Sequence, residues 1–191
     1  VTIMATPFAG HKDRLKESEF VEPQDIPEIA MYLYEIGKPL HLEGCPGIGK
    51  TYIGEVIAEK LAERQGLTLV KDVKKIANYG WDEGEFGLIQ SNMSHYEPED
   101  WMMPVIDTPV LPVHPNGLFQ IDEIAKTPDT FRFVSQLMDE SRIGFDYFLP
   151  ANTYIVSTSN RATDGAASHY LTSDLVNRIL RLKVKPTTEG F

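Results

Sequence analysis

The sequence predicts an α/β protein with a mostly parallel sheet that is covered by helices on both faces. Strand-like and helix-like segments alternate along the chain, and several strand candidates, including residues 117–121 and 154–158, are nearly continuous runs of apolar or β-branched residues. Such runs are typical of strands buried on both faces, because a half-exposed strand alternates apolar and polar side chains. With 191 residues, of which 42% are hydrophobic, the chain can bury one good core.

The first half of the chain supplies the opening elements of this alternation. Residues 1–24 mix charges, glycine and proline without a period, so we expect an arm or linker there. Helices are predicted from apolar residues three and four positions apart and from their ends, such as Gly66 after the second helix. The expected elements are a short helix over 25–37, a strand over 39–43, a helix over 50–65, and strands over 67–73 and 86–93.

The second half continues the pattern after an irregular stretch. Four prolines between residues 104 and 117 argue against regular structure there. Thr127-Pro128 is a typical helix start, in which the threonine caps the helix and the proline occupies its first turn. The expected elements are a strand over 117–121, the helix that begins at Pro128, a small hairpin over 142–149, a strand over 154–158, a short helix over 172–179 and a last strand over 180–184.

The segment GCPGIGKT, residues 44–51, has the spacing of a phosphate-binding loop and lies between an expected strand and an expected helix. Glycines allow a tight turn whose backbone N–H groups face anionic oxygens, and the positive end of the following helix points to the same place. Lys50 would reach the β- and γ-phosphates, and the Thr51 hydroxyl would bind Mg²⁺. The expected nucleotide-binding residues are Gly44, Cys45, Pro46, Gly47, Ile48, Gly49, Lys50, Thr51 and Tyr52.

Two carboxylates follow the apolar strand candidate over 117–121, at the carboxyl end where open α/β sheets bind ligands. Asp122 would anchor the Mg²⁺ shell, and Glu123 would orient and deprotonate an attacking water. Asn160 ends a later strand candidate. Its amide would hydrogen-bond the γ-phosphate or the attacking water, or serve only as a turn residue, and spacing alone does not decide between these roles. Gln120 is a polar residue inside a buried strand for which the pattern gives no reason.

The composition argues against several classes of function. A net charge of −10, from 28 acidic and 18 basic residues, argues against a free-standing nucleic-acid-binding surface. No apolar run reaches the roughly 18 residues that a membrane-spanning helix needs, so we expect no membrane partner. Cys45 is the only cysteine, which excludes an internal disulfide and fits a reducing compartment. We therefore expect a cytoplasmic protein.

Taken together, these residues resemble the AAA+ ATPases, and in particular their MoxR-like branch, over roughly residues 25–185. The EPED segment at residues 97–100 is similar to the one that follows the second strand in that branch, and the hairpin over 142–149 is similar to the one before its sensor strand. The resemblance rests mainly on GCPGIGKT, GLFQIDEIAKTPDTFRFVSQLMDESRIG, YFLPANTYIVSTSNRATDGAASHYL and TSDLVNRILRLKV.

The resemblance implies a five-stranded parallel sheet, hydrolysis of ATP with Mg²⁺, and a hexameric ring. It implies catalytic roles for Lys50 and Glu123, and it makes Asn160 the polar sensor. It makes Arg178 the arginine finger that reaches the ATP of the neighbouring subunit, with Arg181 as the alternative. Members of this branch often act on partners that carry a von Willebrand A-type domain, so a protein partner of that class is implied.

The sequence departs from the family pattern in two places. The family carries a small helical lid after the last strand, whereas only residues 186–191 follow here, so we expect them to be the start of a missing or truncated lid. Residues 67–85 look like an insertion in the region of the second helix. We therefore expect an arm over 1–24, a nucleotide-binding domain over 25–185 and the beginning of a lid over 186–191.

The distribution of charge is compatible with a ring. Residues 81–131 contain ten acidic residues and one basic residue, whereas residues 161–185 contain five basic and two acidic residues. An acidic face and a basic face that meet head to tail form a contact that can close into a ring. Two unrelated solvated faces explain the same counts equally well.

Other functions share part of this pattern. A small-molecule kinase with a phosphate-binding loop needs an acceptor pocket and a basic lid, whereas Asp122-Glu123 followed by Asn160 favours water as the acceptor. A nucleotide-gated scaffold would bind ATP and assemble without hydrolysing it. A DNA-loading ATPase shares this core, although the sequence lacks the basic segments of a DNA-binding groove. A GTPase is disfavoured because the base-reading motif Asn-Lys-x-Asp does not occur.

Overall fold

A computed structural model of the protein describes residues 20–71, 82–93, 116–125, 128–143, 147–162 and 171–186. The expectations for residues 1–19, 72–81, 97–100, 104–115 and 187–191, and for the cap at Thr127, lie outside these ranges. The elements are β1 (Phe20–Val21), η1 (Pro23–Asp25), α1 (Ile26–Glu35), β2 (Leu40–Glu43), α2 (Lys50–Gln65), β3 (Thr68–Val70), β4 (Glu85–Asn92), β5 (Asn116–Asp122), α5 (Pro128–Glu140), β6 (Arg142–Ile143), β7 (Tyr147–Phe148), β8 (Asn152–Ser159), α6 (Ser173–Val176) and β9 (Leu180–Val184).

Seven strands form the central sheet, in the order β1-β9-β2-β8-β5-β4-β3, and all neighbours pair in parallel. The predicted parallel sheet is confirmed, and β6 and β7 form the predicted antiparallel hairpin. The implied count of five strands is wrong, because the described residues contain two further edge strands. β1 pairs with β9 at one edge, where Lys185 N donates to Val21 O at 2.9 Å, and β3 pairs with β4 at the other edge.

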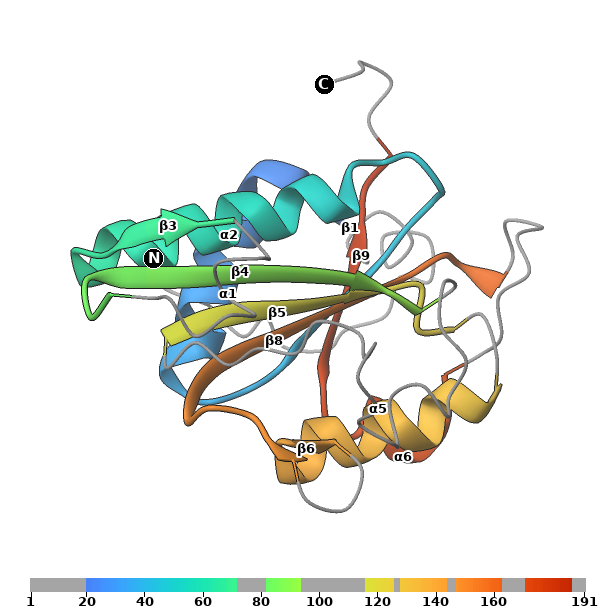
Figure 1. The fold of residues 1–191 in the computed structure, drawn as a ribbon. Helices are drawn as coiled ribbons and strands as arrows, with labels where there is room; N and C mark the ends of the chain where they lie inside the picture. Colours follow the sequence, from blue (N-terminus) through green and yellow to red (C-terminus); the bar gives the residue numbers. More distant parts are fainter. Residues whose placement is uncertain are drawn as a thin grey trace.

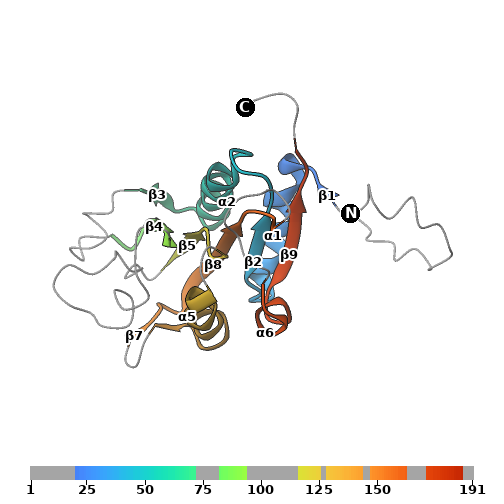
Figure 2. The ribbon, with the colours of Figure 1, turned by 90° about the vertical axis from the view of Figure 1, so that its right-hand side faces the viewer.

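Helices cover both faces of this sheet. Figures 1 and 2 show α2 on one side of the sheet and α5 and α6 on the other, and α1 packs in the same apolar layer as α2. Successive residues of a strand enter different apolar layers: Leu118 packs with α1 and α2, whereas Phe119 packs with α5 and α6, and Tyr154 and Ile155 divide in the same way. Both faces of the central strands are therefore buried, which explains their continuous apolar runs.

Local signals set the ends of the helices. α2 has the predicted bounds, because Gly49 and Gly66 take left-handed conformations at its two ends. α6 is shorter than the predicted helix over 172–179. The Thr172 hydroxyl caps it by accepting from Leu175 N at 3.4 Å. None of the helices within the described ranges is long and apolar enough to span a bilayer.

Candidate functional site

The glycine-rich segment forms the turn between β2 and α2. Gly47 and Gly49 have φ angles of 77° and 83°, left-handed conformations that glycine adopts without a steric penalty. Gly44 N donates to Ser159 O at 3.2 Å, which ties the start of the loop to the end of β8. The loop follows β2 and therefore emerges at the carboxyl end of the parallel sheet. Because β2 lies between β8 and β9, the loop is next to the ends of both of these strands.

Lys50 begins α2 and folds its side chain back over the loop. Its Nζ donates to Gly44 O and Cys45 O, both at 2.8 Å, and to Asn160 Oδ1 at 3.0 Å. An ammonium group has three protons to donate, and these three oxygens hold it between the loop and the end of β8. Lys50 and Asn160, which were predicted as site residues from separate motifs, are therefore in direct contact.

Asp122 ends β5 as a buried carboxylate that receives three side-chain hydrogen bonds. Its Oδ2 accepts from Thr51 Oγ1 at 2.9 Å. Its Oδ1 accepts from Thr158 Oγ1 at 2.8 Å and from Gln120 Nε2 at 2.9 Å. Thr51 and Asp122, the two predicted Mg²⁺ ligands, are thus joined directly, and the carboxylate is fixed in orientation by donors from three elements.

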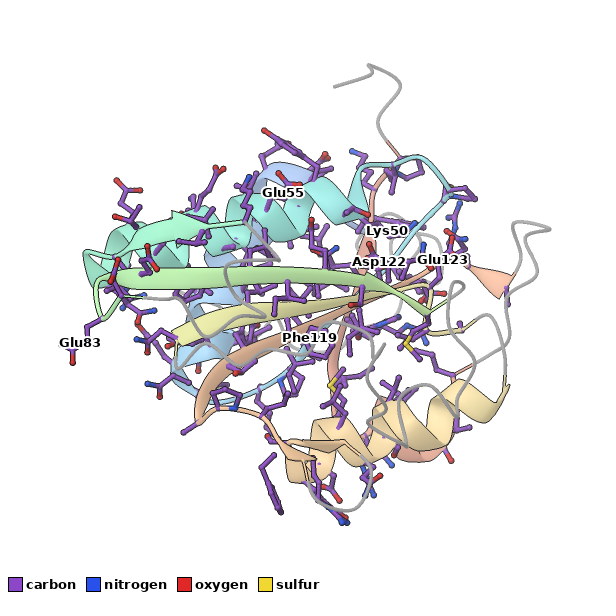
Figure 3. The ribbon with its side chains drawn as sticks, viewed as in Figure 1. Lys50, Glu55, Glu83, Phe119, Asp122 and Glu123 are labelled. Atoms are coloured by element: carbon purple, nitrogen blue, oxygen red, sulfur yellow. The ribbon has the colours of Figure 1, made fainter. Side chains whose placement is uncertain are left out.

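Glu123 follows Asp122 at the same end of the sheet, where Figure 3 labels both residues together with Lys50. Its φ angle is 61°, in the left-handed region that glutamate adopts rarely and at a cost of roughly 1–2 kcal/mol. Its backbone N donates to Thr158 Oγ1 at 3.4 Å, and the next residue, Ile124, donates its N to Thr158 O at 3.0 Å. A strained residue that its surroundings hold in place is a feature of functional sites.

Arg178, the predicted arginine finger, and Arg181, its alternative, both contact groups of their own chain. Arg178 Nη1 donates to Ser135 O at 3.3 Å and pairs with Asp139 Oδ2 at 3.1 Å, so its described partners lie on α5. Arg181 lies on β9, where its Nε pairs with Glu43 Oε2 at 2.7 Å. These contacts anchor both side chains to their own chain, and the finger role stays a prediction for each.

Cys45 also has a charged neighbour. The Arg161 guanidinium contacts the Cys45 sulfur, and its central carbon lies 5.8 Å from the centre of the Phe20 ring on β1. Arg161 directly follows Asn160, so the same turn after β8 contacts both the thiol of the loop and the ammonium group of Lys50. The glycine-rich loop is therefore connected to the edge strand β1 through Arg161.

A polar cluster lies inside the sheet beneath the loop. The His41 ring on β2 is fully buried, and its Nδ1 and Nε2 each lie 2.9 Å from a serine hydroxyl of β8, those of Ser157 and Ser159. Burial lowers the pKa of His41 to about 3, and the positive charges of Arg181 and Lys50 act in the same direction. The imidazole is therefore neutral, with one ring nitrogen donating and the other accepting.

The side chains at the carboxyl end of the sheet fit a magnesium nucleotide. A hydroxyl and a carboxylate are hard oxygen donors of the kind that Mg²⁺ prefers, and proteins commonly supply only one or two such ligands beside phosphate oxygens and water. Thr51 and Asp122 are the groups that would hold the ion. Lys50 and the backbone N–H groups of the loop and first turn of α2 are the groups that would face the phosphates.

Comparisons with known proteins support the fold. The chain matches no protein-family model and no curated protein sequence. Among solved structures, it is similar to NtrX from Brucella abortus, with 14% identity, 85% of this chain and 35% of that chain covered, and a TM-score of 0.55. It is also similar to a "putative ATPase" from Cytophaga hutchinsonii, with 19% identity, 91% and 51% coverage, and a TM-score of 0.54.

A further match is NtrX from Brucella abortus in complex with ADP, with 14% identity, 91% and 38% coverage, and a TM-score of 0.52. The chain therefore spans between about a third and a half of the length of these structures. At such identities the matches concern the fold alone, and they agree with the predicted α/β architecture.

Sequence reasoning missed part of this site. Gln90 and His41 were not singled out, and Gln120 was noted without an explanation. A signal existed: Gln90 lies two residues before the end of β4 and Gln120 two residues before the end of β5, and the two pair in register. Polar residues at matching depths in neighbouring buried strands indicate a shared hydrogen bond, but only once the strand order is known.

Proposed function

We propose that the chain binds Mg·ATP at the phosphate-binding loop and hydrolyses it, as an AAA+ ATPase core. One observation carries this proposal: side chains of three predicted motifs meet at the carboxyl end of the sheet. Lys50 contacts Asn160, and Thr51 contacts Asp122. A plain glycine-rich turn gives no reason for a lysine, an asparagine and a buried carboxylate to converge on it.

Nucleotide binding would use the contacts that the loop already makes. The Lys50 ammonium would exchange backbone carbonyl oxygens for the more strongly accepting β- and γ-phosphate oxygens, since charge-assisted hydrogen bonds are stronger than those to neutral acceptors. Thr51 and Asp122 would hold Mg²⁺, which supplies positive charge to the phosphate oxygens. The loop N–H groups would complete the cradle.

Hydrolysis would be the task of Glu123 and Asn160. In this scheme Glu123 takes a proton from water as the water oxygen bonds to the γ-phosphorus, and the bond from that phosphorus to the bridging oxygen breaks to release ADP and phosphate. The Asn160 amide, which touches Lys50 Nζ through its oxygen, would hold the γ-phosphate or the water with its NH₂ group. Water is favoured as the acceptor because a carboxylate stands ready at the site.

We further propose that the complete protein works as a ring of the MoxR-like type on a protein partner, with a von Willebrand A-type domain as the candidate class. In that arrangement Arg178 acts on the ATP of the next subunit. Within its own chain Arg178 contacts Ser135 O and Asp139 on α5, so the finger role requires the guanidinium to leave these partners. In a ring, the Arg178 guanidinium would reach the ATP of the neighbouring subunit.

A matched pair of carboxylate variants tests the proposal. Glu123→Gln should bind ATP with wild-type affinity and lose about 10²–10⁴ in hydrolysis rate, because an amide can hold the water but cannot take its proton. Glu83→Gln makes the same chemical change at an exposed position at the other end of the sheet, and should hydrolyse normally. Calorimetry and phosphate release are the measurements.

Three results would count against the proposal in different ways. Hydrolysis by Glu123→Gln at the wild-type rate would place the base elsewhere. ATP binding without phosphate release by the wild-type protein, in assembled rings, would favour the scaffold alternative. Phosphate transfer to an acceptor other than water would favour the kinase alternative.

A further inference from the structure

The unexplained Gln120 belongs to a closed ring of hydrogen bonds around the candidate Mg²⁺ ligands. Gln90 Nε2 donates to Thr51 O at 3.1 Å and to Gln120 Oε1 at 2.9 Å. Gln120 Nε2 donates to Asp122 Oδ1 at 2.9 Å, and Asp122 Oδ2 accepts from Thr51 Oγ1 at 2.9 Å. The ring therefore starts at the Thr51 carbonyl and returns to the Thr51 hydroxyl through two amides and one carboxylate.

The direction of every bond in this ring is dictated by Asp122. An ionised carboxylate only accepts, so Gln120 must turn its NH₂ group toward Asp122 and its carbonyl oxygen toward Gln90. Gln90 must then donate its own NH₂ group, which also reaches the Thr51 carbonyl. Neither amide can flip without placing two donors or two acceptors against each other. Only one orientation of the two amides therefore satisfies all the hydrogen bonds of the ring.

The helix leaves room for this ring at a single residue. Gly54 is buried in α2, and a Cβ atom placed on it would lie 1.8 Å from Gln120 Oε1. Glycine inside a helix is less favourable than alanine, yet this one provides the space that the Gln120 side chain fills. The pairing of a helix-weakening glycine with a buried polar residue indicates that the position of the amide matters to the protein.

We propose that Gln120 and Gln90 are positioning residues that set the metal affinity of the site. Gln120 holds Asp122 Oδ1, so that Oδ2 faces the Thr51 hydroxyl. Gln90 donates to the Thr51 carbonyl and so fixes the backbone of the first turn of α2. This inference rests on the proposed Mg·ATP site. Partners of this kind, which orient a ligand without touching the metal, typically contribute 10–100-fold to metal affinity.

The test uses methionine, which has a similar length and no amide, at both ring positions. The variants are Gln120→Met, Gln90→Met and the double variant, with Gln65→Met, at the exposed end of α2, as the control. ADP binding is measured in EDTA, which also reports folding. Mn²⁺ binding is then followed by the loss of the free-ion EPR signal, with protein in excess over ADP so that no free nucleotide competes for the ion.

Each ring variant should bind ADP in EDTA like the wild type and bind Mn²⁺ about 10–100-fold more weakly, whereas Gln65→Met should match the wild type in both. The double variant should lose no more than the worse single variant, because either change opens the same ring. A structural role alone would weaken ADP and Mn²⁺ binding together.

The outcomes separate this inference from the proposed function. If the wild-type protein binds neither ADP nor, in the presence of ADP, Mn²⁺, the inference and the proposed function are both refuted. Wild-type protein that binds both, with Gln120→Met and Gln90→Met showing unchanged Mn²⁺ affinity, would overturn the inference and leave the Mg·ATP site standing. Additive losses in the double variant would show two separate contributions and also refute the ring.

Discussion

Acidification should weaken the fold through His41, and the size of the effect follows from its surroundings. The ring is fully buried between Ser157 and Ser159, and burial, with the charges of Arg181 and Lys50, lowers its pKa to about 3. In the unfolded chain a histidine has a pKa near 6.5. Between these two values the unfolded state binds a proton that the folded state does not.

The folded state is therefore disfavoured as the pH falls from about 6.5 toward 3, by about 1.4 kcal/mol for each pH unit well inside that window. Above pH 6.5 both states hold a neutral ring, and the contribution of His41 is constant. Lowering the pH from about 7.5 to about 5.5 should thus reduce the free energy of unfolding by about 1.4 kcal/mol through this residue alone, since only about one of the two units lies below the unfolded pKa.

Urea unfolding at the two pH values measures this loss in the wild type and in His41→Gln, whose amide can still bond to the serine hydroxyls but does not titrate. Carboxylates contribute equally to both proteins and cancel in the difference. We expect the wild type to lose about 1.4 kcal/mol more than the variant over this interval. Equal losses would show that His41 takes up its proton in the folded protein, and would refute the burial argument.

The remaining predictions concern the loop and the arginine finger. Lys50→Ala should lose ATP binding. Arg178→Ala should bind ATP normally and hydrolyse it about 10³–10⁵ times more slowly. Mixing the two variants should partly restore activity, because Arg178 of the Lys50→Ala variant can serve the intact site of the Arg178→Ala variant. No recovery in rings shown to be mixed would argue against action in trans. Alkylation of Cys45 should be slowed by Mg·ATP, since the thiol belongs to the loop, and mass spectrometry that finds equal labelling with and without nucleotide would place the thiol away from the phosphates.

Local signals made much of the fold predictable. The bounds of α2 follow from the glycines on either side, and the glycine-rich loop, the acidic pair and Asn160 were all recognisable because each ends a strand or begins a helix. Parallel strands bring their carboxyl ends to the same end of the sheet. The contact between Lys50 and Asn160 therefore follows from strand direction once the sheet is known to be parallel.

Other features depend on residues far apart in the sequence, and no local pattern reports them. β1 contains two residues and has no periodicity, and it is a strand only because β9 lies beside it, with Glu22 and Lys185 forming an ion pair across 163 positions. Gln120 contradicts the apolar pattern of its strand until Gln90 on a neighbouring strand and Gly54 on a helix are placed next to it.

The position of β2 in the sheet sets an order of events during synthesis. Both neighbours of this strand, β8 and β9, come much later in the chain, and His41 and Ser157 are 116 residues apart. A nascent chain that has emerged only as far as α5 contains the whole glycine-rich loop but neither of the strands that flank β2. Contacts of such long range are slow to form. A nucleotide bound as proposed would therefore meet a complete site only after β8 has joined the sheet, because Asn160 follows that strand and contacts Lys50.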